Sequence, residues 1–384
     1  MASDKQDKVL NVPTLRFPKF SGEWVRDNIF NVAPLQRGFD LPTQDIEDGE
    51  YPVVYSNGIL RTHKYYKCEA PGLVTGRSGS IGNFTFIPEG NYWPHNTSLW
   101  VTNFHGNDPL FIYYLYQTIN ISQYATGSGV PTLNRNDVHR HGVSIPLVPE
   151  QRKIAEFLSL IDKRIVTQNR IIEDLRNLKT YIHNRVFSKV NTLFGQRNTI
   201  RLSDIATKIT RKNKGNTINN VLSNSAAMGI VPQAEVFDKE IANEDNTANY
   251  YVIENGDFVY NPRKSAQAPF GPINMYKGQA KGIISPLYLC FQVTDINKNY
   301  LLHYFMSNVW YSYIYSNGDT GVRHDRVSIK DETFLNMPLY IHTVDKQQEI
   351  AKMMDQVDAK IALEELYLTK LQKQKDYLLA AMFV

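Results

Sequence analysis

Residues 151–187, QRKIAEFLSLIDKRIVTQNRIIEDLRNLKTYIHNRVF, and residues 347–383, QQEIAKMMDQVDAKIALEELYLTKLQKQKDYLLAAMF, are two copies of one pattern. A constant offset of 196 residues aligns them without gaps. The identical pairs are Gln151/Gln347, Ile154/Ile350, Ala155/Ala351, Asp162/Asp358, Ile165/Ile361, Leu175/Leu371, Lys179/Lys375, Tyr181/Tyr377 and Phe187/Phe383. A repeat at such a long period indicates a duplicated architecture.

Apolar residues recur in both stretches at alternating steps of four and three, the signature of a coiled-coil helix. Neither stretch contains Pro or Gly. The predicted seam consists of Ile154, Leu158, Ile161, Ile165, Ile172, Leu175, Ile182, Ile350, Met354, Val357, Ile361, Leu368, Leu371 and Leu378. Polar residues interrupt both seams at the same two places, Gln168/Glu364 and Lys179/Lys375. Matching interruptions predict that the two helices pack against each other. Two unrelated surface helices, or a coiled coil between two copies of the chain, remain alternatives.

A second repeated stretch precedes each helix. Residues 129–146, GVPTLNRNDVHRHGVSIP, align with residues 321–338, GVRHDRVSIKDETFLNMP, at an offset of 192. The change from 192 to 196 predicts four extra residues in a loop between Pro338 and Gln347. The chain therefore divides into a variable region and a helix, twice. The expected boundaries are an N-terminal tail at 1–16, variable regions at 17–149 and 191–344, and helical segments at 150–190 and 345–384.

Each variable region is predicted to be an α+β domain, because short β-type runs alternate with Gly, Pro and Asn turns and with some helical segments. Residues 73–87 and 282–293 have the sequence pattern of strands next to turns, whereas residues 109–116 and 300–315 suggest aromatic-rich helices.

Composition narrows the class of protein. The 384 residues are enough for two to four domains, and 42% hydrophobic with 21% charged residues excludes disorder along the whole chain. No run of residues is long and apolar enough for a membrane span, and the N-terminus lacks the apolar core of an export signal. The two cysteines have no metal-type spacing, so neither a disulfide framework nor a zinc module is expected. We expect a cytoplasmic protein.

The basic residues suggest a DNA partner through their positions rather than their number. A net charge of +4 is too close to neutral to imply nucleic-acid binding by itself. However, Arg and Lys gather in loops beside Ser, Thr, Asn and Gln, the mixture that holds phosphates and reads base edges. Any single loop could be an ordinary solvated turn, so the argument depends on the set. The candidate DNA-binding residues are Arg37, Lys64, Arg77, Ser78, Ser80, Asn83, Arg135, Lys208, Arg211, Lys212, Lys214, Arg263, Lys264, Arg323, His324 and Arg326.

No enzyme motif in the sequence indicates that the chain catalyses a reaction. The sequence has no GxxxxGK[ST] phosphate loop, no G-x-S-x-G elbow and no HExxH. Asn261-Pro262 has the start of the motif of adenine methyltransferases, but Arg263 and Lys264 occupy its last two positions. We therefore predict no catalytic, cofactor-binding or metal-binding residues in this chain.

At this point the chain resembles the specificity (S) subunit of Type I restriction-modification systems. The resemblance covers nearly the whole chain. It rests on PTLRFPKFSGEW at 13–24, PLVPEQRKIA at 146–155, the IDKRI and VDAKI cores of the two helices, the ending MFV and, above all, the duplicated layout. One departure is that the second helix begins through YIHTVDKQQ, without the Pro-Glu of the first.

The resemblance implies that each variable region is a target recognition domain reading one half of a bipartite DNA sequence, with the two helices packed antiparallel as spacers. Two modification subunits would bring S-adenosylmethionine and adenine methylation, and two restriction subunits would bring ATP- and magnesium-dependent translocation and cleavage. This chain would choose the sequence and perform no chemistry. The alternative is an adaptor whose coiled coil scaffolds two protein-binding domains.

Overall fold

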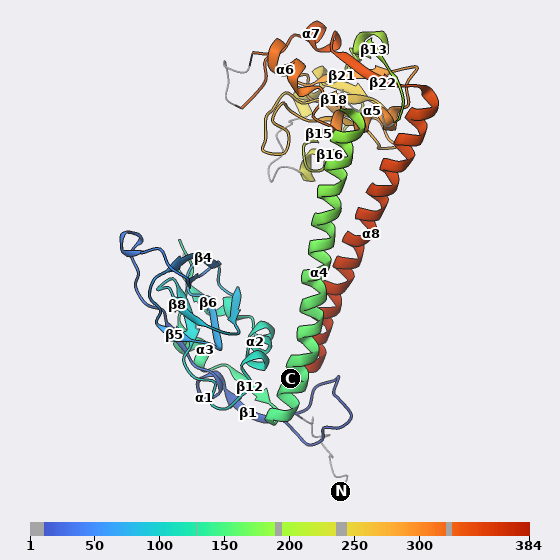
Figure 1. The fold of residues 1–384 in the computed structure, drawn as a ribbon. Helices are drawn as coiled ribbons and strands as arrows, with labels where there is room; N and C mark the ends of the chain where they lie inside the picture. Colours follow the sequence, from blue (N-terminus) through green and yellow to red (C-terminus); the bar gives the residue numbers. More distant parts are fainter. Residues whose placement is uncertain (1–10, 128, 189–193, 236–243, 320–324) are drawn as a thin grey trace. The chain divides into compact units, whose positions relative to one another are not determined.

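The computed structural model describes residues 11–127, 129–188, 194–235, 244–319 and 325–384 (Figure 1). Two compact units make up the chain. The first comprises Met1–Asn169 and Leu366–Val384, and the second comprises Arg170–Glu365. Each unit thus contains one α+β region together with part of both long helices, α4 (Val148–Phe187) and α8 (Val344–Met382).

The first unit holds short strands and helices ahead of α4. Its elements are β1 (Val25–Asn28), α1 (Ile29–Val32), β2 (Leu35–Arg37), β3 (Tyr51–Tyr55), β4 (Gly58–His63), β5 (Cys68–Glu69), β6 (Gly72–Gly76), β7 (Phe84–Ile87), β8 (Asn91–Pro94), β9 (Ser98–Val101), α2 (Pro109–Thr118), β10 (Ala125–Thr126), β11 (Thr132–Leu133), α3 (Arg135–His139) and β12 (Gly142–Ile145).

The second unit follows the same plan between α4 and α8. Its elements are β13 (Arg197–Arg201), β14 (Ala206–Lys208), β15 (Val221–Ser225), β16 (Gly229–Pro232), β17 (Tyr251–Ile253), β18 (Phe258–Tyr260), β19 (Ile273–Met275), β20 (Gly282–Ile284), β21 (Leu289–Val293), α5 (Lys298–Met306), α6 (Tyr311–Asn317), α7 (Asp331–Leu335) and β22 (Pro338–His342).

The strand order repeats from one unit to the other. Sheets β2-β9-β6-β7 and β4-β3-β8-β5 of the first unit correspond, strand for strand, to β14-β21-β18-β19 and β16-β15-β20-β17 of the second. The parallel pair of each unit, β3 with β8 and β15 with β20, also corresponds, as do the antiparallel ladders β1-β12 and β13-β22. The predicted fold class, two tandem α+β domains each followed by a long helix, is confirmed.

Within each unit the two long helices run antiparallel, and an ion pair joins them. In the first unit Lys375 Nζ lies 2.8 Å from Asp162 Oδ1, and in the second Lys179 pairs with Asp358. These four residues are two of the repeated identities, so one contact is made twice. None of the fourteen predicted seam residues is exposed. Nine are buried, and Ile165, Leu175, Ile182, Val357 and Leu368 are half-buried.

The predicted loop between Pro338 and Gln347 is wrong, because β22 occupies 338–342. Gln151 Nε2 donates to the carbonyl of Pro146 at 2.9 Å, and Gln347 Nε2 donates to that of His342 at 2.9 Å. The offset of 196 therefore already holds before the helices, and it also relates α3 to α7. The offset therefore changes upstream of α7. The single helix suggested for 300–315 is likewise two helices, α5 and α6.

The N-terminal segment holds both helix ends of the first unit. Leu15 N donates to the carbonyl of Ala381 at 2.8 Å. Arg16 Nε and Nη2 donate to the two carboxylate oxygens of buried Glu150 at 2.7 and 2.8 Å. A fork of this kind supplies the charge partner that a buried carboxylate requires. Position 346, which corresponds to Glu150, is a half-buried lysine paired with Glu349. The Glu that the second repeat lacks is thus a buried ion-pair partner in the first unit.

The helix packing can be tested with two leucines of α4. Leu158 is fully buried in the first core, whereas Leu160 is 51% exposed. Leu158→Ala is expected to lower the free energy of unfolding by about 3 kcal/mol, because it deletes buried methyl groups and leaves a cavity. Leu160→Ala is the matched control and should change it by less than about 0.5 kcal/mol. Urea unfolding of the full chain measures both. Equal losses would contradict the packing described.

Candidate nucleic-acid interface

Three predicted arginines of the first unit meet at one cavity. Arg37 at the end of β2, Arg77 after β6 and Arg135 at the start of α3 line a hollow of about 660 Å³. The chain joins these segments through backbone contacts, since Leu133 N donates to the carbonyl of Arg77 at 2.7 Å and Ser78 bridges Thr132. Asp40 lines the same hollow and pairs with Arg37, so the three guanidinium groups and one carboxylate among the lining residues leave a net charge of +2. The cavity therefore has the charge of a phosphate-binding surface.

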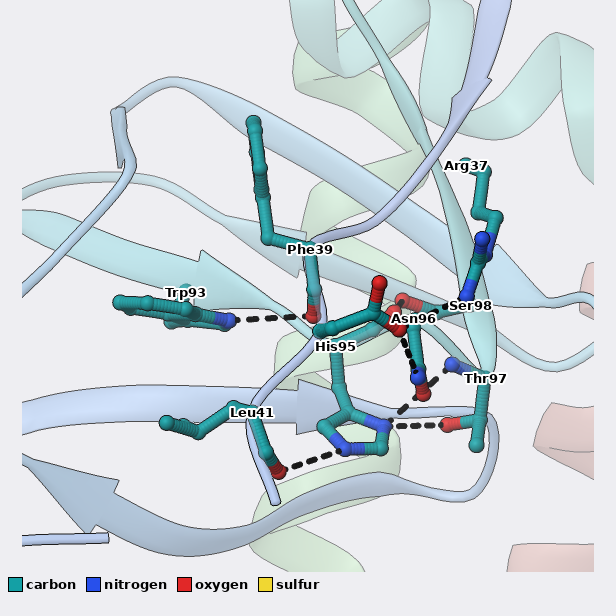
Figure 2. Close-up of polar contacts among 9 residues, drawn as sticks. Arg37, Phe39, Leu41, Trp93, His95, Asn96, Thr97 and Ser98 are labelled. Carbon is teal, nitrogen blue, oxygen red and sulfur yellow. Dashed lines mark hydrogen bonds and ion pairs between the residues drawn. The ribbon is translucent and has the colours of Figure 1, made fainter. Parts of the chain in front are cut away.

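Next to this cavity, hydrogen bonds join residues 39–41 to the segment 93–97 (Figure 2). Phe39 N donates to the carbonyl of Pro94 at 2.8 Å, and Trp93 Nε1 donates to the carbonyl of Phe39 at 3.3 Å. His95 bonds through one ring nitrogen to Thr97 Oγ1 at 3.0 Å and through the other to the carbonyl of Leu41 at 3.3 Å. Burial lowers the pKa of His95, which favours the neutral ring in this position.

Two polar side chains stand on these loops near Arg37. Asp40 accepts from Arg37 Nη2 at 2.7 Å and also from the amide of Asn96. Neither Asp40 nor Asn96 was among the sequence candidates. Asn96 follows a strand in an ordinary polar turn, and only its spatial neighbours distinguish it.

The other candidates of the first unit are dispersed. Lys64 Nζ lies 3.2 Å from Glu47 and 5.4 Å from the centre of the Tyr65 ring. Ser78 and Ser80 lie in the turn after β6, and Asn83 lines a separate cavity of about 510 Å³ next to α8. Gly76 has no room for a side chain, because a Cβ would lie 2.1 Å from the carbonyl oxygen of Ser80. The tight turn after β6 therefore requires glycine at position 76.

In the second unit, two of the predicted basic loops come together. Lys264 N donates to the carbonyl of Asp325 at 2.8 Å, Val327 N donates to that of Pro262 at 2.9 Å, and Arg263 bridges Arg326. Arg263 is exposed and makes no ion pair with the residues that the structure describes, while Arg326 lies 3.6 Å from its neighbour Asp325. Arg323 and His324 lie outside the described residues.

The remaining basic candidates divide into paired and exposed side chains. Lys208 Nζ lies 2.5 Å from Asp331, and this hydrogen bond raises the lysine pKa. Arg211 contacts Glu254 at 3.1 Å and Asp257 at 3.3 Å. In contrast, Lys212 and Lys214 are exposed on the turn after β14. Cations already held by carboxylates offer less to a phosphate. Lys208 and Arg211 are therefore weaker candidates, as is Arg37, which pairs with Asp40 in the first unit.

No group of three or more His, Cys, Asp or Glu residues in the described part of the chain is arranged to hold a metal ion. Among the helices of the described segments, none is long and apolar enough to cross a membrane.

The chain is similar to a known protein family and to solved structures. A family model described as Type I restriction modification DNA specificity domain matches residues 22–177 and again residues 197–373. Among solved structures, the chain is similar to the Type-I restriction-modification system S subunit from M. genitalium, with 16% identity, a TM-score of 0.56 and coverage of 97% of this chain and 99% of that one. A structure described as showing complex assembly and conformational transition of the type I R-M system gives 14% identity, a TM-score of 0.54 and coverage of 93% and 96%. At these identities the likeness concerns the fold. No curated protein sequence matches the chain significantly.

The family model, matched once in each half of the duplicated chain, identifies a DNA sequence-recognition subunit. The chain belongs to the Type I restriction modification DNA specificity domain family, whose model covers most of its length. It is accordingly the non-catalytic, sequence-recognising component of a Type I restriction-modification system, and the adaptor alternative is set aside.

The joined loops of the second unit can be tested by salt titration. Replacing Arg263 by Ala should weaken binding of duplex DNA and reduce the slope of log affinity against log salt by about 1, since one cation no longer displaces a counterion. Lys208→Ala is the matched control, and we expect the slope to remain unchanged because Asp331 already neutralises that lysine. Fluorescence anisotropy at low salt measures both. If Lys208→Ala lowers the slope by as much as the arginine replacement does, the distinction between carboxylate-paired and exposed cations is wrong.

Proposed function

We propose that residues 17–149 and 191–344 are the two target recognition domains, each reading one half of a bipartite DNA sequence. The observation that carries the proposal is the repeated topology, with exposed basic loops joined by backbone contacts in both domains. Two copies of one reading module require two half-sites, which matches a bipartite target. We further propose that the residues that contact DNA belong to the set of 16 candidates, with Arg77, Arg135 and Arg263 foremost.

The long helices are proposed to set the gap between the half-sites. α4 has 40 residues, which corresponds to about 60 Å at ~1.5 Å per residue. Such a length exceeds one turn of duplex DNA, about 34 Å. A paired helix is stiff, so its length translates into a fixed separation rather than a range.

This role predicts the result of a matched deletion. Removing residues 165–171 and 361–367 deletes one heptad from each helix and retains the four residues of the repeated ion pairs. About 10 Å is lost, so the unread gap should shorten by about three base pairs while both half-sites stay the same. Mapping N6-methyladenine in cells that also express the methyltransferase subunits gives the gap directly. An unchanged gap in an assembled complex would refute the spacer role.

The helices are also proposed to dock two modification subunits. Eight of the nine repeated identities between the helices are buried, half-buried or ion-paired within the chain. The ninth, Tyr181/Tyr377, is 61% and 65% exposed. An identity that internal packing does not require suggests a surface that meets the same partner twice. Tyrosine is also among the residues that most often dominate protein interfaces.

Tyr181→Ala together with Tyr377→Ala should weaken assembly with the methyltransferase subunits by about 30-fold, as expected for aromatic anchors worth about 2 kcal/mol. The control is Tyr315→Ala, which removes a tyrosine that is 69% exposed but has no repeated counterpart. Sedimentation velocity with purified subunits measures assembly. Normal assembly of the double variant would show that these tyrosines do not dock the partner.

The remaining components belong to the partners in this proposal. S-adenosylmethionine would be bound by two modification subunits, and ATP and magnesium by two restriction subunits. Nothing is proposed to bind as a cofactor to this chain, which would act in the cytoplasm beside the genome.

A further inference from the structure

We propose that Asn96 is an adenine-reading side chain of the first recognition domain. This inference rests on the proposed function and specifies one contact within it. The position is the turn between β8 and β9 (Figure 2). There Asn96 bonds to Asp40, which lines the cavity together with Arg37, Arg77 and Arg135.

The hydrogen bonds of Asn96 leave free the groups that adenine needs. An asparagine amide has two N–H donors and one carbonyl acceptor. One donor is used by the carboxylate of Asp40. Across the described residues, Oδ1 of Asn96 has no hydrogen-bond partner. One donor and the acceptor therefore remain, and this pair matches N7 and the N6 amino group of adenine in the major groove.

The contact with Asp40 orients the amide. The same carboxylate oxygen accepts from Arg37 Nη2 at 2.7 Å and from Asn96 Nδ2. Because an ionised carboxylate can only accept hydrogen bonds, the NH₂ end of the amide faces Asp40. Oδ1 is then directed away from Asp40. Neutralisation of Asp40 by Arg37 also reduces the repulsion that a lone carboxylate would exert on DNA.

The backbone beneath Asn96 is fixed before any ligand arrives. The ring of His95 lies 4.3 Å from that of Tyr55, centre to centre, and both of its nitrogens are bonded. Gly38 packs so closely that a Cβ there would lie 2.2 Å from the carbonyl oxygen of His95. A reading group on a rigid support loses little freedom on binding, which favours specificity.

The turn is also connected to the phosphate-binding surface. Arg77 N donates to the carbonyl of Thr97 at 2.9 Å. The backbone of Arg77 is therefore hydrogen-bonded to the residue that follows Asn96. Phosphate contacts set the register of a protein on the duplex, and base contacts then specify the sequence. The arginine cavity and Asn96 supply these two functions side by side.

The test uses the full chain assembled with its methyltransferase subunits and a DNA pool randomised in both half-sites. Methylated molecules are sequenced. The wild-type complex should require adenine at one position of one half-site. Asn96→Ala should reduce the preference for adenine there by about 5- to 150-fold, with every other position unchanged. Asn96→Asp should shift the same position toward cytosine, since a carboxylate accepts from the cytosine amino group.

Asn57→Ala is the matched control, because Asn57 is exposed in the β3–β4 turn and does not line the cavity. It should leave the whole motif unchanged. A uniform loss of methylation in both Asn96 variants, or an unchanged motif, would overturn the assignment while leaving the proposed function intact. A wild-type complex that selects no bipartite motif would instead refute the proposed function.

Discussion

The arrangement depends on which charges meet between the long helices. Asp162 and Asp358 are equivalent positions of the repeat, and so are Lys179 and Lys375. Placed parallel and in register, the helices would bring aspartate against aspartate and lysine against lysine. The antiparallel arrangement pairs each aspartate with a lysine, once in each unit. Polar residues in a seam commonly fix register and orientation at some cost in stability. Because these charges repeat at equivalent positions, the antiparallel orientation pairs opposite charges where the parallel one would oppose like charges. It also gives each unit one N-terminal and one C-terminal helix segment.

The two units use the same framework with different interiors. Tyr114 of α2 donates to Asp162 at 2.8 Å in the first unit. In the second unit α5 instead places His303 against Asp355 at 3.1 Å and against His183 at 3.2 Å. Burial lowers the pKa of His183 to about 3, helped by the neighbouring His303 and Lys179, so this ring is neutral inside the fold. Its equivalent in the first unit is Leu379. Loops and interiors can thus diverge while the helix contacts stay the same, which would allow the two proposed recognition domains to read different half-sites.

Periodic and local features could be predicted from the sequence, whereas contacts between distant segments could not. The helices and their seam were predictable because every heptad repeats the same information. The strand order was not, because the parallel pairing of β3 with β8 joins residues about 40 positions apart. Lys208 and Arg211 were chosen by residue type, but their acidic partners lie 123, 43 and 46 residues away. Asn96 was missed for the same reason, since Asp40 is 56 residues upstream. The wrong loop before the second helix came from extending a weak alignment across β22.

The central claim is that this chain chooses the DNA sequence for a partner that performs the chemistry. The most direct measurement is a genome-wide map of N6-methyladenine in cells that express the methyltransferase subunits, with and without this gene. The account predicts that methylation disappears from one motif, two short half-sites around a fixed unread gap, when the gene is absent. An unchanged map in cells whose methyltransferase subunits are expressed and active would contradict it.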